Sequence, residues 1–267
     1  MAMSHSQAVL AAIGNDLHDS SADPQTAARP WTAVFIIASP RPGTGKTFLA
    51  RLIADFLRID GGAIAAFELS PGDVTLAEQL PGGLTAQSDL ESTQAQMRLF
   101  DRLILADGVA KVVDVGHASF PRFFSLMDEI GFADEAQRRG LDVIVLYGVD
   151  AHPNTEKAYS ILQRRIPSMI LVPVFNDGIL KGRKLRDQYP FTRAAAVPMQ
   201  IPLLPPALKA QAERPGHSFL EIHSQLPTPV PIGPAFELRS WTKRVFLEFR
   251  ELELRLLMEK LRASLKG

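Results

Sequence analysis

The segment AVFIIASPRPGTGKTFLARLIADFL, residues 33–57, decides the fold of this chain. It starts with a short apolar run, continues through a turn rich in glycine and proline, and then places apolar residues at three- and four-residue spacing. The short run is typical of a buried strand, and the later spacing is typical of an amphipathic helix. The segment therefore predicts a strand, a tight loop and a helix in direct succession.

The loop of this segment matches a phosphate-binding pattern, G-x-x-x-x-G-K-[ST], at its end. Gly45, Lys46 and Thr47 fit the last three positions, and Pro40 stands where the pattern has its first glycine. In this pattern backbone N–H groups face phosphate oxygens, the lysine neutralises them, and the hydroxyl binds magnesium. The helix N-terminus that follows also favours an anion.

These features predict ATP and Mg²⁺ as ligands of the loop. The alternative is a glycine-proline turn that contains Gly-Lys-Thr by chance. The residues expected to hold the nucleotide here are Pro42, Gly43, Thr44, Gly45, Lys46, Thr47 and Phe48.

Apolar runs alternate with helical patterns through the rest of the chain. Further strands are predicted at 63–69, 111–115, 141–147, 169–175 and 195–201, with helices at 91–107, 119–130, 154–166 and 178–188. This alternation predicts an α/β fold with a doubly wound, mostly parallel sheet of the P-loop NTPase type, covered by helices on both faces. Ligands of such sheets bind at the carboxyl ends of the strands.

Three segments are expected along the chain. Residues 1–29 lack sustained periodicity and are predicted to be a flexible leader, and residues 30–225 form the nucleotide-binding domain. Residues 226–267 hold a proline-rich linker and one long helix over about 236–265. The polar face of that helix mixes acidic and basic residues, which favours packing on the domain or on a partner helix over a membrane surface.

Composition excludes several classes of function. The net charge is zero, so no global field recruits nucleic acid, and the absence of cysteine excludes disulfides, thiolate metal sites and cysteine nucleophiles. The six histidines have no paired-ligand spacing, which leaves magnesium arriving with the nucleotide as the only metal implied. Neither a signal peptide nor a transmembrane run of about 20 apolar residues is evident, so a cytoplasmic location is expected.

A later acidic residue is expected to complete the nucleotide site. The predicted strand at 111–115 contains Asp114, which is placed to orient magnesium. AAA-type ATPases share the sequence Pro-Gly-Thr-Gly-Lys-Thr found at 42–47, but their machinery needs an Asp-Glu pair at the end of a later strand. This strand has the aspartate and no adjacent glutamate, which argues against that class.

The chain resembles the ParA/MinD family of positioning ATPases, whose deviant Walker A loop has the form K-G-G-x-G-K-[ST]. With Gly45, Lys46 and Thr47 aligned, the family's signature lysine falls on Arg41 and its two glycines fall on positions 42 and 43. The segment 67–72, Phe-Glu-Leu-Ser-Pro-Gly, is similar to a family strand end of the form D-x-D-P-Q. The likeness covers about residues 31–225.

The resemblance implies roles for residues outside the loop. Asp114 takes the position of the Walker B aspartate, Asn176 that of an asparagine near the adenine, and Pro202 lies in a segment that lines the base. Family members form ATP-sandwiched dimers in which the signature lysine reaches the partner's phosphates. Arg41 can supply that charge with a forked geometry.

One departure from the family pattern bears on hydrolysis. Glu68 and Ser70 stand at the two acidic positions of the strand end, and Ser70 replaces an acid that in the family helps to hold the attacking water. Hydrolysis is therefore expected to be slow, or to use another group. Asp73 and His117 are candidates, with plain turn and loop residues as the alternative reading of both.

Together these observations predict a nucleotide-dependent switch. ATP and Mg²⁺ would stabilise a homodimer that positions a DNA or protein cargo, with Arg41, Lys46 and Asp114 in catalytic roles and Thr47 and Asp114 serving magnesium. The basic segment 181–186 is either a contact for DNA phosphates or a solvated cluster. Two alternatives stay open: a scaffold or pseudo-ATPase without efficient hydrolysis, and a metabolic P-loop kinase or ligase.

Overall fold

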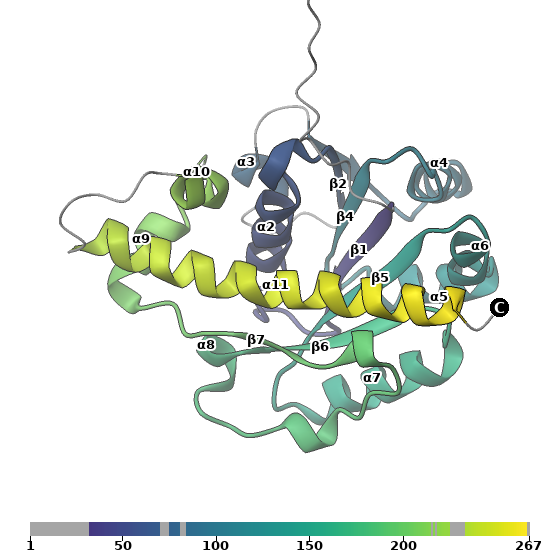
Figure 1. Cartoon of the computed structure of the whole chain (residues 1–267). Helices are drawn as coiled ribbons and strands as arrows, with labels where there is room; N and C mark the ends of the chain where they lie inside the picture. Colours follow the sequence, from purple (N-terminus) through teal and green to yellow (C-terminus); the bar gives the residue numbers. More distant parts are fainter. Residues whose placement is uncertain are drawn as a thin grey trace, which may run out of the picture.

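The structure is a computed structural model of the chain, and it describes residues 32–69, 75–80, 84–214, 216, 218–224 and 233–265. The predicted leader over 1–29 and most of the proline-rich linker lie outside the described residues, as do Ser70 and Asp73. Figure 1 shows a central sheet with helices on either side of it.

A seven-stranded sheet forms the centre of the described part of the chain, and every neighbouring pair of strands in it is parallel. The strand order is β3-β2-β4-β1-β5-β6-β7. In chain order the strands are β1 (Ala33–Ala38), β2 (Ile64–Leu69), β3 (Thr85–Ser88), β4 (Ala110–Val115), β5 (Asp142–Gly148), β6 (Ile170–Asn176) and β7 (Met199–Ile201). The predicted α/β fold with a parallel sheet is confirmed.

Helices cover both faces of the sheet, because alternate side chains of each central strand enter two separate cores. Phe35 and Ile37 of β1 join the first core, whereas Val34 and Ile36 join the second. The first face is covered by α2 (Lys46–Leu57), α3 (Leu76–Gln79), α9 (Pro206–Ala212), α10 (Phe219–Ser224) and α11 (Pro234–Ser264). The second face is covered by α4 (Thr93–Leu103), α5 (Phe120–Glu129), α6 (Phe132–Arg138) and α7 (Pro153–Arg165).

The long helix predicted near the C-terminus is confirmed as α11, which lies across the front of the view in Figure 1. One stripe of it, including Trp241, Val245 and Phe249, is buried in the same core as α2. The Trp241 ring nitrogen also donates a hydrogen bond to the Pro202 carbonyl at 3.0 Å. The helix therefore packs on the sheet rather than standing apart from it.

Two predicted elements are wrong in extent. The helix expected at 178–188 is reduced to α8 (Asp177–Leu180) and a 3-10 turn, η2 (Arg186–Gln188). Lys181 and Gly182 have φ of 49° and 82°, which ends the helix. The strand expected at 195–201 is only β7, because 194–196 forms another 3-10 turn, η3 (Ala194–Ala196). A third 3-10 turn, η1 (Ile59–Gly61), follows α2.

Several elements were not predicted. The edge strand β3 has the sequence Thr-Ala-Gln-Ser, which contains no apolar run. Helices α3, α6, α9 and α10 have between four and seven residues, too short for a clear helical period. Among the described residues, no helix combines the length and the apolar character that crossing a bilayer requires.

Candidate functional site

The loop between β1 and α2 lies at the carboxyl edge of the sheet, as predicted. Two of its glycines have left-handed backbone conformations, with φ of 70° at Gly43 and 78° at Gly45. Residues with a side chain rarely adopt these values, so the glycines permit the turn. Gly45 is the N-cap of α2, whose 12 residues start at Lys46. The free N–H groups of the first turn of α2 therefore border the loop.

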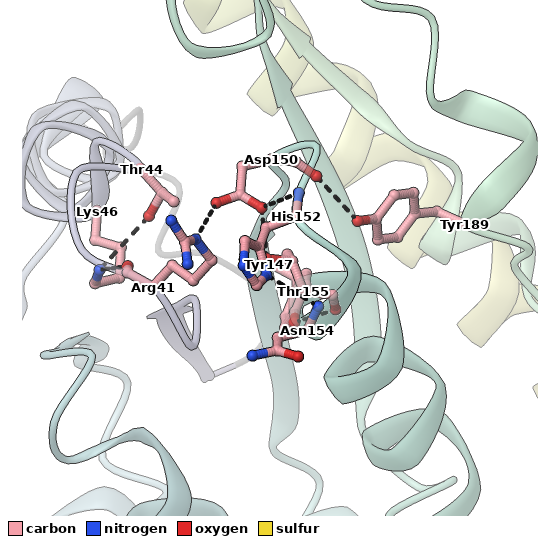
Figure 2. Close-up of polar contacts among 9 residues, drawn as sticks. All are labelled: Arg41, Thr44, Lys46, Tyr147, Asp150, His152, Asn154, Thr155 and Tyr189. Carbon is pink, nitrogen blue, oxygen red and sulfur yellow. Dashed lines mark hydrogen bonds and ion pairs between the residues drawn. The ribbon is translucent and has the colours of Figure 1, made fainter.

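Lys46 folds back over the loop that precedes it. Its ammonium group donates a hydrogen bond of 2.8 Å to the Arg41 carbonyl and lies 3.5 Å from the Thr44 hydroxyl. Figure 2 shows this side chain curled beside the loop. Burial lowers the pKa of Lys46, and the negative charge of Asp114 opposes that effect. The lysine thus supplies a partly desolvated cation to the centre of the loop.

The Thr47 hydroxyl is bonded to the carboxylate of Asp114 on β4. The hydroxyl donates to Asp114 Oδ2 at 2.6 Å, although the two residues are 67 positions apart. Because β4 is the direct neighbour of β1, Asp114 stands beside Ile37, close to the end of the strand that leads into the loop. The two residues predicted to serve magnesium are therefore in contact.

A second buried carboxylate stands next to Asp114. Glu68 of β2 is in register with Asp114 and is 2% exposed. One of its oxygens accepts a hydrogen bond of 2.9 Å from the Leu76 backbone N–H. The other oxygen, Oε2, is buried and has no hydrogen-bond partner among the described residues. Glu68 is the first of the two positions that the family fills with acids, and the second, Ser70, lies outside the described residues.

The electrostatics of this pair favour a nearby cation. Burial raises the pKa of Asp114 to about 6, the Thr47 hydrogen bond opposes this shift, and the charge of Glu68 adds to it. Two carboxylates and a hydroxyl offer oxygen atoms only, which is the donor type that Mg²⁺ prefers. Within the described ranges no cluster of three or more His, Cys, Asp or Glu side chains is suited to hold a metal. A magnesium ion here would therefore need further oxygen ligands from water or phosphate.

Arg41 is tied to the loop that follows β5, a contact that the sequence did not predict. Its Nε donates to Asp150 Oδ2 at 2.9 Å, and the two side chains are 39% and 16% exposed. The second Asp150 oxygen accepts hydrogen bonds from the His152 N–H and the Thr155 hydroxyl at the start of α7. Figure 2 shows Asp150 between Arg41 and these partners, with Tyr189 on its far side. The β1–α2 loop and α7 are thus linked through one carboxylate.

The residues predicted to meet the base fall into two groups. Asn176 ends β6 close to the loop, because a Cβ atom on Gly45 would lie 3.4 Å from its amide nitrogen. Phe48 and Asn176 line one small cavity with Gly45. Pro202 follows β7, and its carbonyl accepts a hydrogen bond from Trp241 on α11. Phe48 packs 5.9 Å from the Trp241 ring, so the two groups are connected through α11.

A larger cavity opens on the other side of the first turn of α2. Its volume is about 240 Å³, and the described residues that line it are Thr47, Phe48, Arg51, Gln79 and Glu213. The cavity thus reaches from the Thr47 position to the ends of α3 and α9. The sequence does not predict this cavity, because its walls come from three separate segments of the chain.

The remaining candidates are exposed at the same edge of the sheet. His117 is in the turn after β4, which joins Asp114 to α5. The basic residues of 181–186 lie in the loop after α8 and are exposed, namely Lys181, Arg183, Lys184 and Arg186. Both segments follow strands whose carboxyl ends border the β1–α2 loop.

Comparison of the sequence with known proteins identifies no family for this chain. No protein-family model matches the sequence. No curated protein is detectably similar to it either. The assignment of a function therefore depends on the loop and its surroundings.

Proposed function

We propose that this protein binds ATP with Mg²⁺ at the β1–α2 loop and acts as a nucleotide-dependent switch ATPase of the ParA/MinD type. The observation that carries the proposal is the contact between the Thr47 hydroxyl and the Asp114 carboxylate at 2.6 Å. The hydroxyl and the acid therefore lie next to the β1–α2 loop, which contains two glycines with left-handed backbone conformations. That combination is what a magnesium-bound triphosphate requires.

Each residue of the loop has a defined task in this proposal. The backbone N–H groups from Gly43 to Thr47 donate to the phosphate oxygens, and the Lys46 ammonium exchanges its bond with the Arg41 carbonyl for one with phosphate. Thr47 and Asp114 hold the magnesium ion, which neutralises phosphate charge when it is bound. Phe48, Asn176 and Pro202 are proposed to border the base.

The switch itself is proposed to act through Arg41. In the structure the Arg41 guanidinium is held by Asp150, beside α7. A triphosphate offers the guanidinium a stronger, bidentate partner, so binding would release Asp150. Arg41 would then serve phosphate in its own chain or in a homodimer, as the resemblance implies. The exposed basic residues of 181–186 border the same edge, and we propose them as the surface for a DNA or protein cargo.

Calorimetric titration with ATP, in the presence and absence of Mg²⁺, tests the nucleotide site. We expect binding that Mg²⁺ strengthens and that Lys46→Ala abolishes. Lys181→Ala is the matched control, because Lys181 is an exposed lysine at the same edge and leaves the loop intact. Absence of ATP binding by the native chain would overturn the proposal. If ATP binds, slow hydrolysis that a cargo protein or DNA accelerates would distinguish a switch from a scaffold that only binds nucleotide.

A metabolic enzyme is the second candidate, and the cavity of about 240 Å³ beside Thr47 supports it. The cavity is lined by Thr47, the residue proposed to bind magnesium, so an acceptor bound there would lie close to the proposed nucleotide site. Glu213 is a polar residue on its wall that is exposed at the end of α9. Screening ATP consumption against small carboxylates, amines and alcohols tests this candidate. Turnover that needs a small substrate, and that Glu213→Gln reduces, would favour the enzyme over the switch.

A further inference from the structure

A second apolar stripe runs along the outer side of α11. Its members recur at spacings of seven, four, three and four residues and are exposed by between 50% and 87%: Leu247, Leu254, Met258, Leu261 and Leu265. The buried stripe of the same helix lies on the opposite side and includes Trp241, Phe249 and Leu256. A helix that packs on its own domain along one side needs no second apolar stripe.

The outer stripe lies away from the phosphate loop. The C-terminal half of α11 borders the first residues of β5 and β6, and Lys260 forms an ion pair of 2.8 Å with Asp142 at the start of β5. The phosphate loop follows the carboxyl end of β1, at the opposite edge of the parallel sheet. A partner on the stripe would therefore leave the nucleotide site open.

We infer that the outer stripe of α11 binds the same stripe of a second copy of this chain, with the two helices antiparallel. The spacing of the stripe resembles the seam of a coiled coil, in which apolar side chains meet along about one side of each helix. Leu254 is at the middle of the stripe and lies near the two-fold axis. Leu247 of each copy then faces Leu261 of the other.

Charges beside the stripe fit this arrangement. Glu251 and Arg255 lie on the same flank, on either side of the central position. In an antiparallel pair with its axis at Leu254, the Glu251 of each copy lies about 3 Å along the helix axis from the Arg255 of the other copy, so the two side chains can meet and the contact occurs twice. Arg255 also donates a hydrogen bond of 3.2 Å to the Val197 carbonyl of its own chain.

The charge content of the segment disfavours a membrane surface as the partner. Residues 247–265 contain four acidic and four basic residues, and helices that lie on anionic lipid carry an excess of lysine and arginine. The acidic residues are Glu248, Glu251, Glu253 and Glu259, and the basic ones are Arg250, Arg255, Lys260 and Arg262. A second copy supplies the complementary charges, whereas an anionic bilayer repels half of them.

Sedimentation velocity of the full chain without nucleotide tests the inference. We expect a dimer at micromolar concentration and a weakening of roughly ten-fold or more with Leu254→Arg, which brings two guanidinium groups together at the axis. Met97→Arg is the matched control, because Met97 is 61% exposed on α4 at the other face of the sheet. Because no nucleotide is present, a failed nucleotide site leaves this result unchanged. A native monomer would overturn the inference.

Disulfide trapping then tests the antiparallel orientation, since the natural chain has no cysteine to interfere. Leu254→Cys is expected to cross-link across the axis. Leu261→Cys is expected not to, because 14 residues of helix place its two copies about 21 Å apart along the axis. Efficient cross-linking of Leu261→Cys with itself would indicate parallel helices and overturn the arrangement. Vesicle binding by a native monomer, lost with Leu254→Arg, would identify a bilayer as the occupant instead.

Discussion

Glu68 and Asp114 stand at matching positions on the neighbouring parallel strands β2 and β4, and both carboxyl groups are buried. Two acids in this arrangement repel each other when both are ionised. The pKa of Asp114 is accordingly raised to about 6, chiefly by burial and further by Glu68. A divalent cation at this edge of the sheet would remove that penalty, which links the two acids to the proposed magnesium site.

The raised pKa of Asp114 predicts that the effect of Mg²⁺ on ATP binding falls as the pH falls through about 6. A protonated carboxyl group is a poor ligand for Mg²⁺, so the ion would then add little affinity. Titrations with and without Mg²⁺ between about pH 5 and pH 8 measure the effect. Mg²⁺ titrations of free ATP at the same pH values correct for the protonation of ATP itself. A Mg²⁺ effect that is constant over this range would contradict the prediction.

The same raised pKa predicts how the stability of the protein, measured without nucleotide, changes with pH. The pKa of Asp114 is about 6 in the folded chain, above its ordinary value of 3.8, so the folded state binds this proton more tightly than the unfolded state. The contribution of Asp114 to stability is therefore present below about pH 4 and is lost as the pH rises through about 6. Asp114→Asn removes the charge and keeps an acceptor for Thr47.

Asp114→Asn should therefore raise the thermal midpoint of unfolding at neutral pH and change it little at about pH 4. Differential scanning calorimetry at the two pH values measures this difference. The variant should at the same time lose the Mg²⁺-dependent part of ATP binding, since stability and function compete at such sites. Equal stabilisation at both pH values would show that the charge of Asp114 is not the cause.

The ion pair between Arg41 and Asp150 predicts that Asp150→Asn strengthens ATP binding. Asparagine keeps an acceptor for the His152 N–H and the Thr155 hydroxyl but releases the Arg41 guanidinium toward phosphate. Because the Arg41 side chain is 39% exposed, the pair contributes little, and the gain should be about two- to five-fold in affinity. Fluorescent ATP analogues measure this change.

A double-mutant cycle separates this effect from a general change in the loop. Arg41→Gln alone should weaken ATP binding, and Asp150→Asn should then have no further effect in the Arg41→Gln background. An equal gain from Asp150→Asn in both backgrounds would mean that Asp150 acts on the site without Arg41.

The local parts of this site could be predicted from the sequence, because the strand, loop and helix of residues 33–57 follow one another directly. The order of the strands could not. Glu68 stands beside Asp114 because β2 and β4 are neighbours in the sheet. The spacing of apolar residues along the sequence does not show which strands will be neighbours. Asp150 was missed for the same reason, since it meets Arg41 across 109 positions of sequence. The prediction of a helix over 178–188 was wrong in extent, because the helical spacing of residues continues past Gly182, where the left-handed backbone interrupts the helix.

The anchoring of α2 supports a last prediction, on folding stability. Asp55 is 1% exposed, and one of its oxygens accepts a hydrogen bond of 2.7 Å from the Phe219 backbone N–H at the start of α10. Arg51, one turn earlier, donates to Gln79 and to the Ala212 carbonyl and lies 4.6 Å from the Phe219 ring centre. The two side chains together attach α2, the helix that follows the β1–α2 loop, to α3, α9 and α10.

Asp55→Ala should therefore lower the free energy of unfolding by about 2 kcal/mol, because it leaves the buried Phe219 N–H without its acceptor. Asp55→Asn keeps an acceptor for the N–H and should lose less than Asp55→Ala. Urea unfolding followed by circular dichroism measures both variants. Equal losses in the two variants would show that the hydrogen bond to the Phe219 N–H contributes nothing to the free energy of unfolding.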